Sequence, residues 1–393
     1  MKKAVVYFTH FASTYGGSEY LPLALVAELQ KTHRVTLALD WESDVARAAR
    51  AIGIPVDVDA LEIVAIKPKN KFLGRLDAIL PFCRTRRLKA LAKDADLCIS
   101  AANPMDFGKP AHHFVYLLAQ FGDNAFKDAV RNVPPPVGLS AMKRRVRTFL
   151  AERFLRPALG LRSTRTILAD FRERIYPNSR YADRTMRAFY GDFNGTVFYP
   201  PTTFEFPRTD ETRRDPLRVV CLGRVIPSKR VTDIIDIVGR ARALSGADIR
   251  LSVGGPTAPG SPYEAEIRRL AAARPWMELV GPVYGEKKAA LLASGAFAVH
   301  ACRDEAFGIA VAEYLKAGTV VLVPNEGGSA EVVDAPELMY RTNDEAAQIL
   351  SRLVSDEEFR EKQRRHCRER ALEFSRERYF ERQHALLSEM LGQ

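Results

Sequence analysis

The stretch that decides the fold is RDEAFGIAVAEYLKAGTVVLVPNEGGSAEVV, residues 303–333. It carries two glutamates, Glu305 and Glu313, eight positions apart in a segment that is otherwise largely apolar. The run after Glu305 has helical spacing and ends at Gly318, the residue type that most often caps a helix at its C-terminal end. A short apolar run, typical of a buried parallel strand, and a Gly-Gly turn follow. The segment therefore predicts a helix, a buried strand and a second helix start.

The same alternation of strands and helices extends through both halves of the chain. We expect strands at residues 3–8, 33–40, 96–101, 112–119, 164–169, 217–224, 249–255, 277–283, 296–301 and 319–324. Helical patterns lie between many of them, at residues 20–32, 43–53, 231–245, 263–275 and 285–295. Strands that alternate with helices of this length indicate an α/β protein with parallel, doubly wound sheets.

A shift in composition divides the chain into two domains. Residues 201–216 are rich in Pro, Thr and charge and have no helical period, which is typical of a linker. We therefore expect one Rossmann-like domain over 1–200, a second over 217–375 and a C-terminal helix over 376–393. Packing of this helix back on the first domain is one arrangement open to it. Two such domains facing across a cleft would bind ligands at the carboxyl ends of their strands.

Composition excludes several classes of protein. An apolar content of 47% and a charged content of 27% are those of a globular chain, and no apolar run approaches the ~18 residues that span a bilayer. The five cysteines are scattered and show neither a disulfide framework nor zinc-site spacing. We expect a cytoplasmic protein, with peripheral attachment to the inner face of the membrane as a further option.

The net charge of +11 is concentrated in part in one segment, residues 131–166, and this concentration indicates an acidic partner. Between 139 and 161 its basic residues alternate with apolar ones that could share one helical face. Such a basic amphipathic helix suits an anionic membrane surface. The alternative is a solvated basic face over an ordinary core stripe. Nucleic-acid binding has no motif to support it.

A group of cations follows the first predicted strand of the second domain. In GRVIPSKR, residues 223–230, Arg224, Lys229 and Arg230 come directly after the strand and just before a helix. Arginine forks, lysine point charges and helix N-termini all bind phosphate oxygens. The motif alone is modest evidence for a phosphate site.

Taken in order, these motifs resemble a known family. GRVIPSKR, EAFGIAVAE, AGTVVLVP and GGSAEVV look like the nucleotide-sugar-binding domain of retaining GT-B glycosyltransferases of the family 4 type, also called glycosyl transferases group 1. Two glutamates separated by seven residues are that group's signature. The first half is similar to the acceptor domain of the same group, through its GGSE loop and its YPNSRYADRTM segment. The resemblance covers nearly the whole chain and is most specific over 219–333.

The resemblance implies a role for each matching residue. Arg224 and Lys229 would bind the donor diphosphate and neutralise the leaving group, which makes a metal or other cofactor unnecessary. Glu305 would hold the donor sugar, and Glu313 the ribose. The further donor-binding positions implied are Gly16, Gly17, Gly223, Val280, Gly281, Phe307, Gly308, Gly327 and Gly328. The expected reaction is retaining transfer of a hexose-type sugar from a UDP- or GDP-sugar to a glycan or lipid-linked hydroxyl, in cell-surface polysaccharide or glycolipid biosynthesis.

The first domain departs from the family at one position. Many members have a histidine just after the strand that corresponds to residues 112–119, whereas here His112 and His113 stand at its start. The acceptor-side candidates are therefore His10, Glu19, Gln120 and Asp123. The departure also leaves two other functions open: a nucleotide-sugar-binding scaffold without transferase activity, and a GT-B epimerase. Intact Glu305 and Glu313 argue against both.

Overall fold

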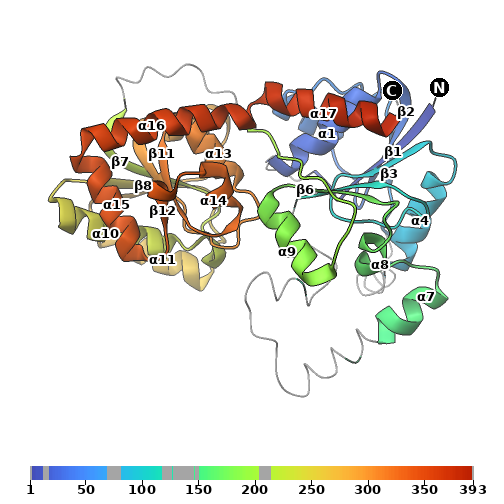
Figure 1. The fold of residues 1–393 in the computed structure, drawn as a ribbon, viewed down its shortest axis with the longest axis horizontal. Coiled ribbons are helices and arrows are strands. Elements are labelled where there is room, and N and C mark those ends of the chain that lie inside the picture. Colours follow the sequence, from blue (N-terminus) through green and yellow to red (C-terminus); the bar gives the residue numbers. More distant parts are fainter. Residues whose placement is uncertain are drawn as a thin grey trace. The chain divides into compact units, whose positions relative to one another are not determined.

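The computed structural model describes residues 2–11, 17–68, 81–116, 126, 146, 150–202 and 214–391. The chain divides into two compact units. The first comprises residues 1–199 and 387–393, and the second comprises residues 200–386. Each unit is built on one six-stranded sheet (Figure 1). The predicted α/β class with two parallel-sheet domains is thus confirmed, and of the predicted linker, residues 203–213 lie outside the described residues.

The first unit has an all-parallel sheet in the order β3-β2-β1-β4-β5-β6. Its strands are β1 (Lys2–Phe8), β2 (His33–Leu39), β3 (Glu62–Ala65), β4 (Leu97–Ser100), β5 (His112–Val115) and β6 (Arg174–Pro177). The connecting helices are α1 (Gly17–Leu29), α2 (Val45–Ile52), α4 (Phe82–Ala92), a π-helical turn (Ala151–Leu155), α7 (Arg156–Ala158), α8 (Thr164–Leu168) and α9 (Arg180–Tyr190). The strand order reverses between β1 and β4, which makes their carboxyl ends the expected ligand position.

The second unit repeats this plan in the order β12-β11-β10-β7-β8-β9. Its strands are β7 (Asp215–Leu222), β8 (Arg250–Gly254), β9 (Met277–Gly281), β10 (Gly295–Val299), β11 (Val320–Pro324) and β12 (Met339–Tyr340). Its helices are α10 (Val231–Ser245), α11 (Pro262–Ala272), α12 (Gly285–Ser294), α13 (Ile309–Lys316), α14 (Gly327–Val333), α15 (Asn343–Ser355) and α16 (Glu357–Ala371), and α17 (Arg376–Leu391) ends the chain. Here the order reverses between β7 and β10.

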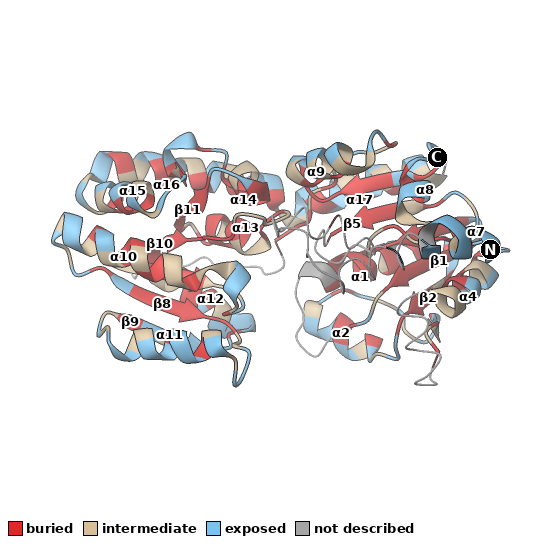
Figure 2. Cartoon of the chain, turned by 90° about the horizontal axis from the view of Figure 1, so that it is seen from below, coloured by how far each residue is buried: buried red, intermediate tan, exposed pale blue. Residues whose placement is uncertain are grey.

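Burial follows the sheets. Every residue of β10 and β11 is buried, as strands covered by helices on both faces require (Figure 2). The outward faces of α10, α11 and α15 are exposed in the same view. Among the described residues no helix is both long enough and apolar enough to cross a membrane.

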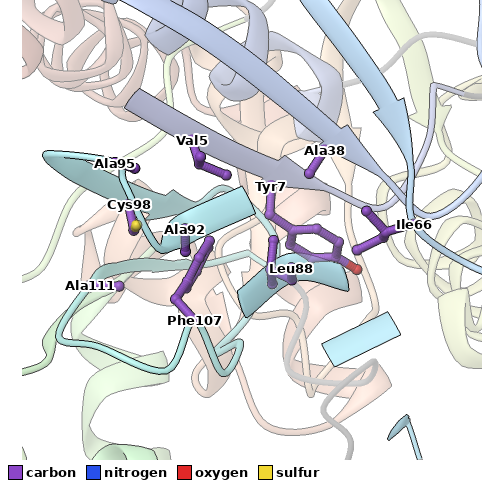
Figure 3. Packing of buried hydrophobic residues seen from close by; sticks show 10 residues of the cluster. All are labelled: Val5, Tyr7, Ala38, Ile66, Leu88, Ala92, Ala95, Cys98, Phe107 and Ala111. Atoms are coloured by element: carbon purple, nitrogen blue, oxygen red, sulfur yellow. The ribbon is translucent and has the colours of Figure 1, made fainter. Parts of the chain in front are cut away.

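The core of the first unit brings α4 onto the sheet. Leu88 and Ala92 of α4 pack with Val5 and Tyr7 of β1 and with Phe107 (Figure 3). The phenol of Tyr7 reaches the edge of this cluster and donates a hydrogen bond to Oδ1 of Asp40 at 3.0 Å. The carboxyl end of β1 therefore packs against this apolar cluster, and polar residues follow it in the chain.

One predicted strand is wrong. Residues 164–169 form helix α8 rather than a strand, because Ser163 caps the N-terminus by accepting a hydrogen bond from the Thr166 amide at 3.1 Å. The edge strand is instead β6, a few residues later. The predicted C-terminal helix over 376–393 is present as α17 (Arg376–Leu391), which begins just after the chain leaves the helical conformation at Ser375 (φ −66°, ψ 158°).

Candidate active site

The predicted site residues Lys229 and Glu305 lie at the switch point of the second sheet, the place between β7 and β10 where the strand order reverses. Strands β7 and β10 are hydrogen-bonded neighbours, so the loops that follow them leave the sheet side by side. Lys229 lies in a short 3₁₀ turn (Pro227–Lys229) after β7, and Glu305 lies in the loop after β10. Their side chains form an ion pair in which Nζ of Lys229 donates to Oε2 of Glu305. The two residues predicted to share a site therefore meet directly.

Burial and charge set the ionisation of this pair. Burial alone would raise the pKa of Glu305, but the imidazole of His300 and the charge of Lys229 outweigh burial and hold that pKa well below its usual range. Burial likewise would lower the pKa of Lys229, but the charge of Glu305 raises it. Both groups are thus charged at neutral pH. Arg224 is exposed and adds its positive charge to that of Lys229.

Glu313 lies deeper in the unit. It is on α13, is buried at 3% exposure and accepts a hydrogen bond from Nζ of Lys288 at 2.6 Å. Lys288 belongs to α12, 25 residues earlier in the chain. This cation was missed by sequence reasoning. A ribose contact of Glu313 stays a prediction.

Glycines near Glu305 determine the conformation and packing of the loop that carries it. Gly308 stands at the N-terminal cap of α13 with φ of 96°, a conformation that side chains rarely adopt. The amide of Gly328 donates to the carbonyl of Glu305 at 2.7 Å. A Cβ at Gly328 would lie 2.1 Å from the carbonyl oxygen of Ala306. The Gly328 amide therefore already has a partner in the Glu305 loop, and a donor contact at Gly327 and Gly328 stays a prediction.

The predicted nucleobase-contacting residues end a neighbouring strand. Val280 and Gly281 are the last two residues of β9, and Val280 is 39% exposed. The carbonyl of Gly281 accepts a hydrogen bond from the Gly255 amide at 2.7 Å, and the Gly223 amide donates to Gly254 at 3.0 Å. These two bonds tie the ends of β7, β8 and β9 together. Phe307 is buried and packs its ring 5.3 Å from that of Phe374, so only its backbone can face a ligand.

The first unit has a pocket of about 310 Å³ at the carboxyl ends of β1 and β4. It is lined by His10 and Glu19, which brings two of the acceptor-side candidates together. The pocket also contains groups that sequence reasoning missed: Arg84, Asn103, Tyr116, Arg156 and Arg162. Asn103 has φ of 61°, an uncommon conformation that recurs at ligand-binding loops. Gly17 begins α1, whereas Gly16, Gln120 and Asp123 lie outside the described residues.

The histidines at the start of β5 have structural partners. Nε2 of His113 lies 2.8 Å from Oε2 of Glu173, with both side chains buried. Nδ1 of His112 lies 2.9 Å from the Tyr176 hydroxyl. Burial, together with the charges of His113 and Arg174, lowers the pKa of His112 to about 4. These two histidines thus join β5 to β6 and its approach.

The whole chain has the fold of the GT-B glycosyltransferases. It is similar to HepE of Anabaena, solved with UDP and glucose, at 15% identity over 99% of this chain and 100% of that one, with a TM-score of 0.66. It is also similar to sucrose-phosphate synthase of Thermosynechococcus elongatus at 14% identity over 100% of both chains, with a TM-score of 0.66. The pneumococcal O-GlcNAc transferase GtfA, solved with UDP and GlcNAc, matches at 9% identity over 100% of this chain and 99% of that one, with a TM-score of 0.64.

A family model matches most of the second unit. Residues 203–373 match the family model described as glycosyl transferases group 1. The predicted resemblance is confirmed to that extent. A search of curated proteins gives no match to the chain.

Proposed function

We propose that this chain transfers a hexose-type sugar from a nucleotide-diphospho-sugar, a UDP- or GDP-sugar, to a hydroxyl of a glycan or lipid-linked acceptor, with retention at the anomeric carbon. The observation that carries the proposal is the Lys229–Glu305 ion pair at the switch point of the second sheet. It places a cation and a carboxylate where open α/β sheets bind their ligands. The UDP in the solved HepE and GtfA structures supports a nucleotide-sugar donor.

In this proposal Arg224 and Lys229 bind the diphosphate, and their charges stabilise it as the sugar leaves. Such fixed charges act at the atoms where negative charge develops, and they are often the largest catalytic contribution. Two cations and the N-terminus of α13 supply this stabilisation without a divalent metal. Transfer is therefore expected to continue in the presence of EDTA. Glu305 accepts hydrogen bonds from the sugar hydroxyls, for which its full ionisation suits it.

Glu313 is proposed to accept hydrogen bonds from the ribose hydroxyls. Its pairing with Lys288 holds it in one position on α13, and a carboxylate can accept more than one hydrogen bond at a time. The pocket at the ends of β1 and β4, with His10 and Glu19 in its lining, is the proposed acceptor site. The proposed setting is cell-surface polysaccharide or glycolipid biosynthesis.

The donor class is tested by thermal unfolding of the full chain with UDP-, GDP- and ADP-sugars. A bound donor at a concentration 100 times its Kd stabilises the folded state by about 2.7 kcal/mol. We expect one base to raise the melting temperature more than the others, and free hexose to leave it unchanged. Release of nucleoside diphosphate with acceptor present then separates a transferase from a protein that only binds. An unchanged melting temperature with every nucleotide sugar would refute the proposal.

The basic segment is proposed to bind an anionic membrane surface. Its predicted apolar face is exposed where the structure describes it: Val146, Leu150, Phe154, Leu155 and Leu159 are between 41% and 58% exposed. These residues are therefore not a core stripe. Exposed apolar side chains beside arginines match the headgroup region of anionic lipid. The basic residues Arg131, Lys143, Arg144, Arg145 and Arg147 lie outside the described residues.

Sedimentation with vesicles of anionic phospholipid tests the membrane proposal. We expect the full chain to sediment at low salt and to be released at high salt, because surface charge attraction is screened. Changing Lys143, Arg144 and Arg145 together to Glu, or Phe154 alone to Ser, should reduce sedimentation several-fold. Phe171→Ser is the matched control, since Phe171 is equally exposed (60%) but lies outside the segment. Unchanged sedimentation of the triple variant would contradict the proposal.

A further inference from the structure

Three side chains of metal-binding type gather at the carboxyl end of β10. They are His300, Cys302 and Glu305, and their ligand atoms all lie within 4.8 Å of one another. His300 and Cys302 are buried, at 6% and 4% exposure, and the Glu305 side chain is 21% exposed. No cysteine or histidine spacing in the sequence pointed to this cluster. It arises because the chain turns back on itself between β10 and α13.

We propose that His300, Cys302 and Glu305 form a Zn²⁺ site, in which the ion replaces the ammonium of Lys229 as the partner of Glu305. An imidazole nitrogen, a thiolate and a carboxylate oxygen are the three ligand types that zinc uses in proteins. The thiolate disfavours Mg²⁺ and Ca²⁺, which prefer oxygen. Ligand atoms around tetrahedral zinc are about 3.5 Å apart, given its bond lengths of about 2.0–2.3 Å. The three side chains would have to close by about one ångström.

An independent observation at His300 points to a missing partner. Among the residues that the structure describes, Nε2 of His300 has no hydrogen-bond partner, although the side chain is more than nine-tenths buried. A buried polar nitrogen without a partner is destabilising. This nitrogen faces Oε2 of Glu305 at 3.5 Å. The His300 carbonyl accepts a hydrogen bond from the Tyr340 hydroxyl at 2.8 Å, which fixes the backbone of His300 to β12.

The local charges favour a cation at this position. The Glu305 carboxylate is paired with the ammonium of Lys229, and a divalent ion offers twice the charge of that ammonium. Sγ of Cys302 lies 3.3 Å from Oδ1 of Asp304, so a second carboxylate stands beside the cluster. Binding of zinc would release the Cys302 proton to solvent. A water molecule or Asp304 would complete four-coordination.

The ion acts as an inhibitor and not as a cofactor. Because Glu305 is the residue proposed to hold the donor sugar, zinc bound to its carboxylate would prevent Glu305 from binding the donor. This consequence rests on the proposed function, whereas metal binding itself does not. The zinc site and its inhibitory effect can fail separately, since zinc binding is measured without any sugar donor.

The test uses the full chain, stripped of metal with EDTA and then dialysed. We expect calorimetry to show one equivalent of Zn²⁺ bound, with at least tenfold weaker binding in His300→Gln and in Cys302→Ser. Co²⁺ bound in place of zinc should show a thiolate charge-transfer absorption that Cys302→Ser abolishes. Lys229→Met should bind Zn²⁺ more tightly, because the competing ammonium is gone. Cys83→Ser is the matched control, since Cys83 is a partly exposed thiol in the other unit.

Several results would overturn the proposal. They are the absence of the thiolate absorption in the unchanged chain, equal zinc affinity in His300→Gln and Cys302→Ser, and loss of binding in Cys83→Ser. Thermal unfolding without metal shows whether each variant is folded, and the cobalt spectrum of the unchanged chain tests the site without any variant. Zinc bound at these residues with undiminished donor turnover would refute the inhibitory role while leaving the site in place.

Discussion

Lys229→Met is expected to lower the rate of sugar transfer by about 100- to 1000-fold at saturating donor, which is the usual effect of removing one group that stabilises developing negative charge. The ammonium of Lys229 is held by Glu305 at the end of β7, so it is in position before the donor binds. Under the proposed function, negative charge grows on the diphosphate as the sugar leaves. The loss should therefore appear mainly in kcat rather than in KM.

Lys287→Met provides the matched control. Lys287 lies on α12 in the same unit and is exposed, so the same change of side chain should leave turnover within about twofold. Melting temperatures of both variants show whether each is folded, since Met removes the ion pair as well as the charge. A folded Lys229→Met variant with more than a tenth of the original kcat would exclude Lys229 from the leaving-group site.

The fold could be predicted largely because the parallel strands are short apolar runs between helical patterns. Strands β10 and β11 are buried throughout, and each is a short apolar run in the sequence. The prediction failed at the edge of the first sheet, where propensity is weakest. Strand β6 is four residues long and begins with Arg174, whereas the run at 164–169 forms a capped helix. At such positions pairing with the neighbouring strand decides the conformation, and the local sequence pattern does not reveal that pairing.

The part of the site that lies at the ends of strands could be predicted. Lys229 and Glu305 could be placed together because each follows a strand and the two strands are neighbours at the switch point. The pairing of Glu313 with Lys288 could not, because it depends on how α12 packs against α13. His300 was also missed, since a single histidine at a strand end carries no spacing signal. These contacts join residues far apart in sequence, and only the packed unit brings them together.

Gly328→Ala is expected to destabilise the second unit by about 2–3 kcal/mol, the usual effect of forcing an extra methyl group into a filled space. The added Cβ would lie 2.1 Å from the carbonyl oxygen of Ala306 and 2.7 Å from the Cα of Phe307. Both are backbone atoms that no rotamer change can move aside. The loop must shift as a whole, and it carries Glu305, whose carbonyl is bound to the Gly328 amide at 2.7 Å. Stabilisation by donor sugars should fall along with the melting temperature.

Gly239→Ala is the matched control, with an expected effect of opposite sign. Gly239 lies within α10, and a Cβ there would meet the ring of Trp276 at 3.8 Å, an ordinary van der Waals contact. Alanine in a helix interior is favoured over glycine by about 0.5–1 kcal/mol, so this variant should be slightly more stable. Melting curves of the two variants therefore separate a general effect of glycine replacement from the close approach at Gly328. If Gly328→Ala melted like the unchanged chain and bound donor equally well, the contact between α14 and the Glu305 loop would not be what positions Glu305.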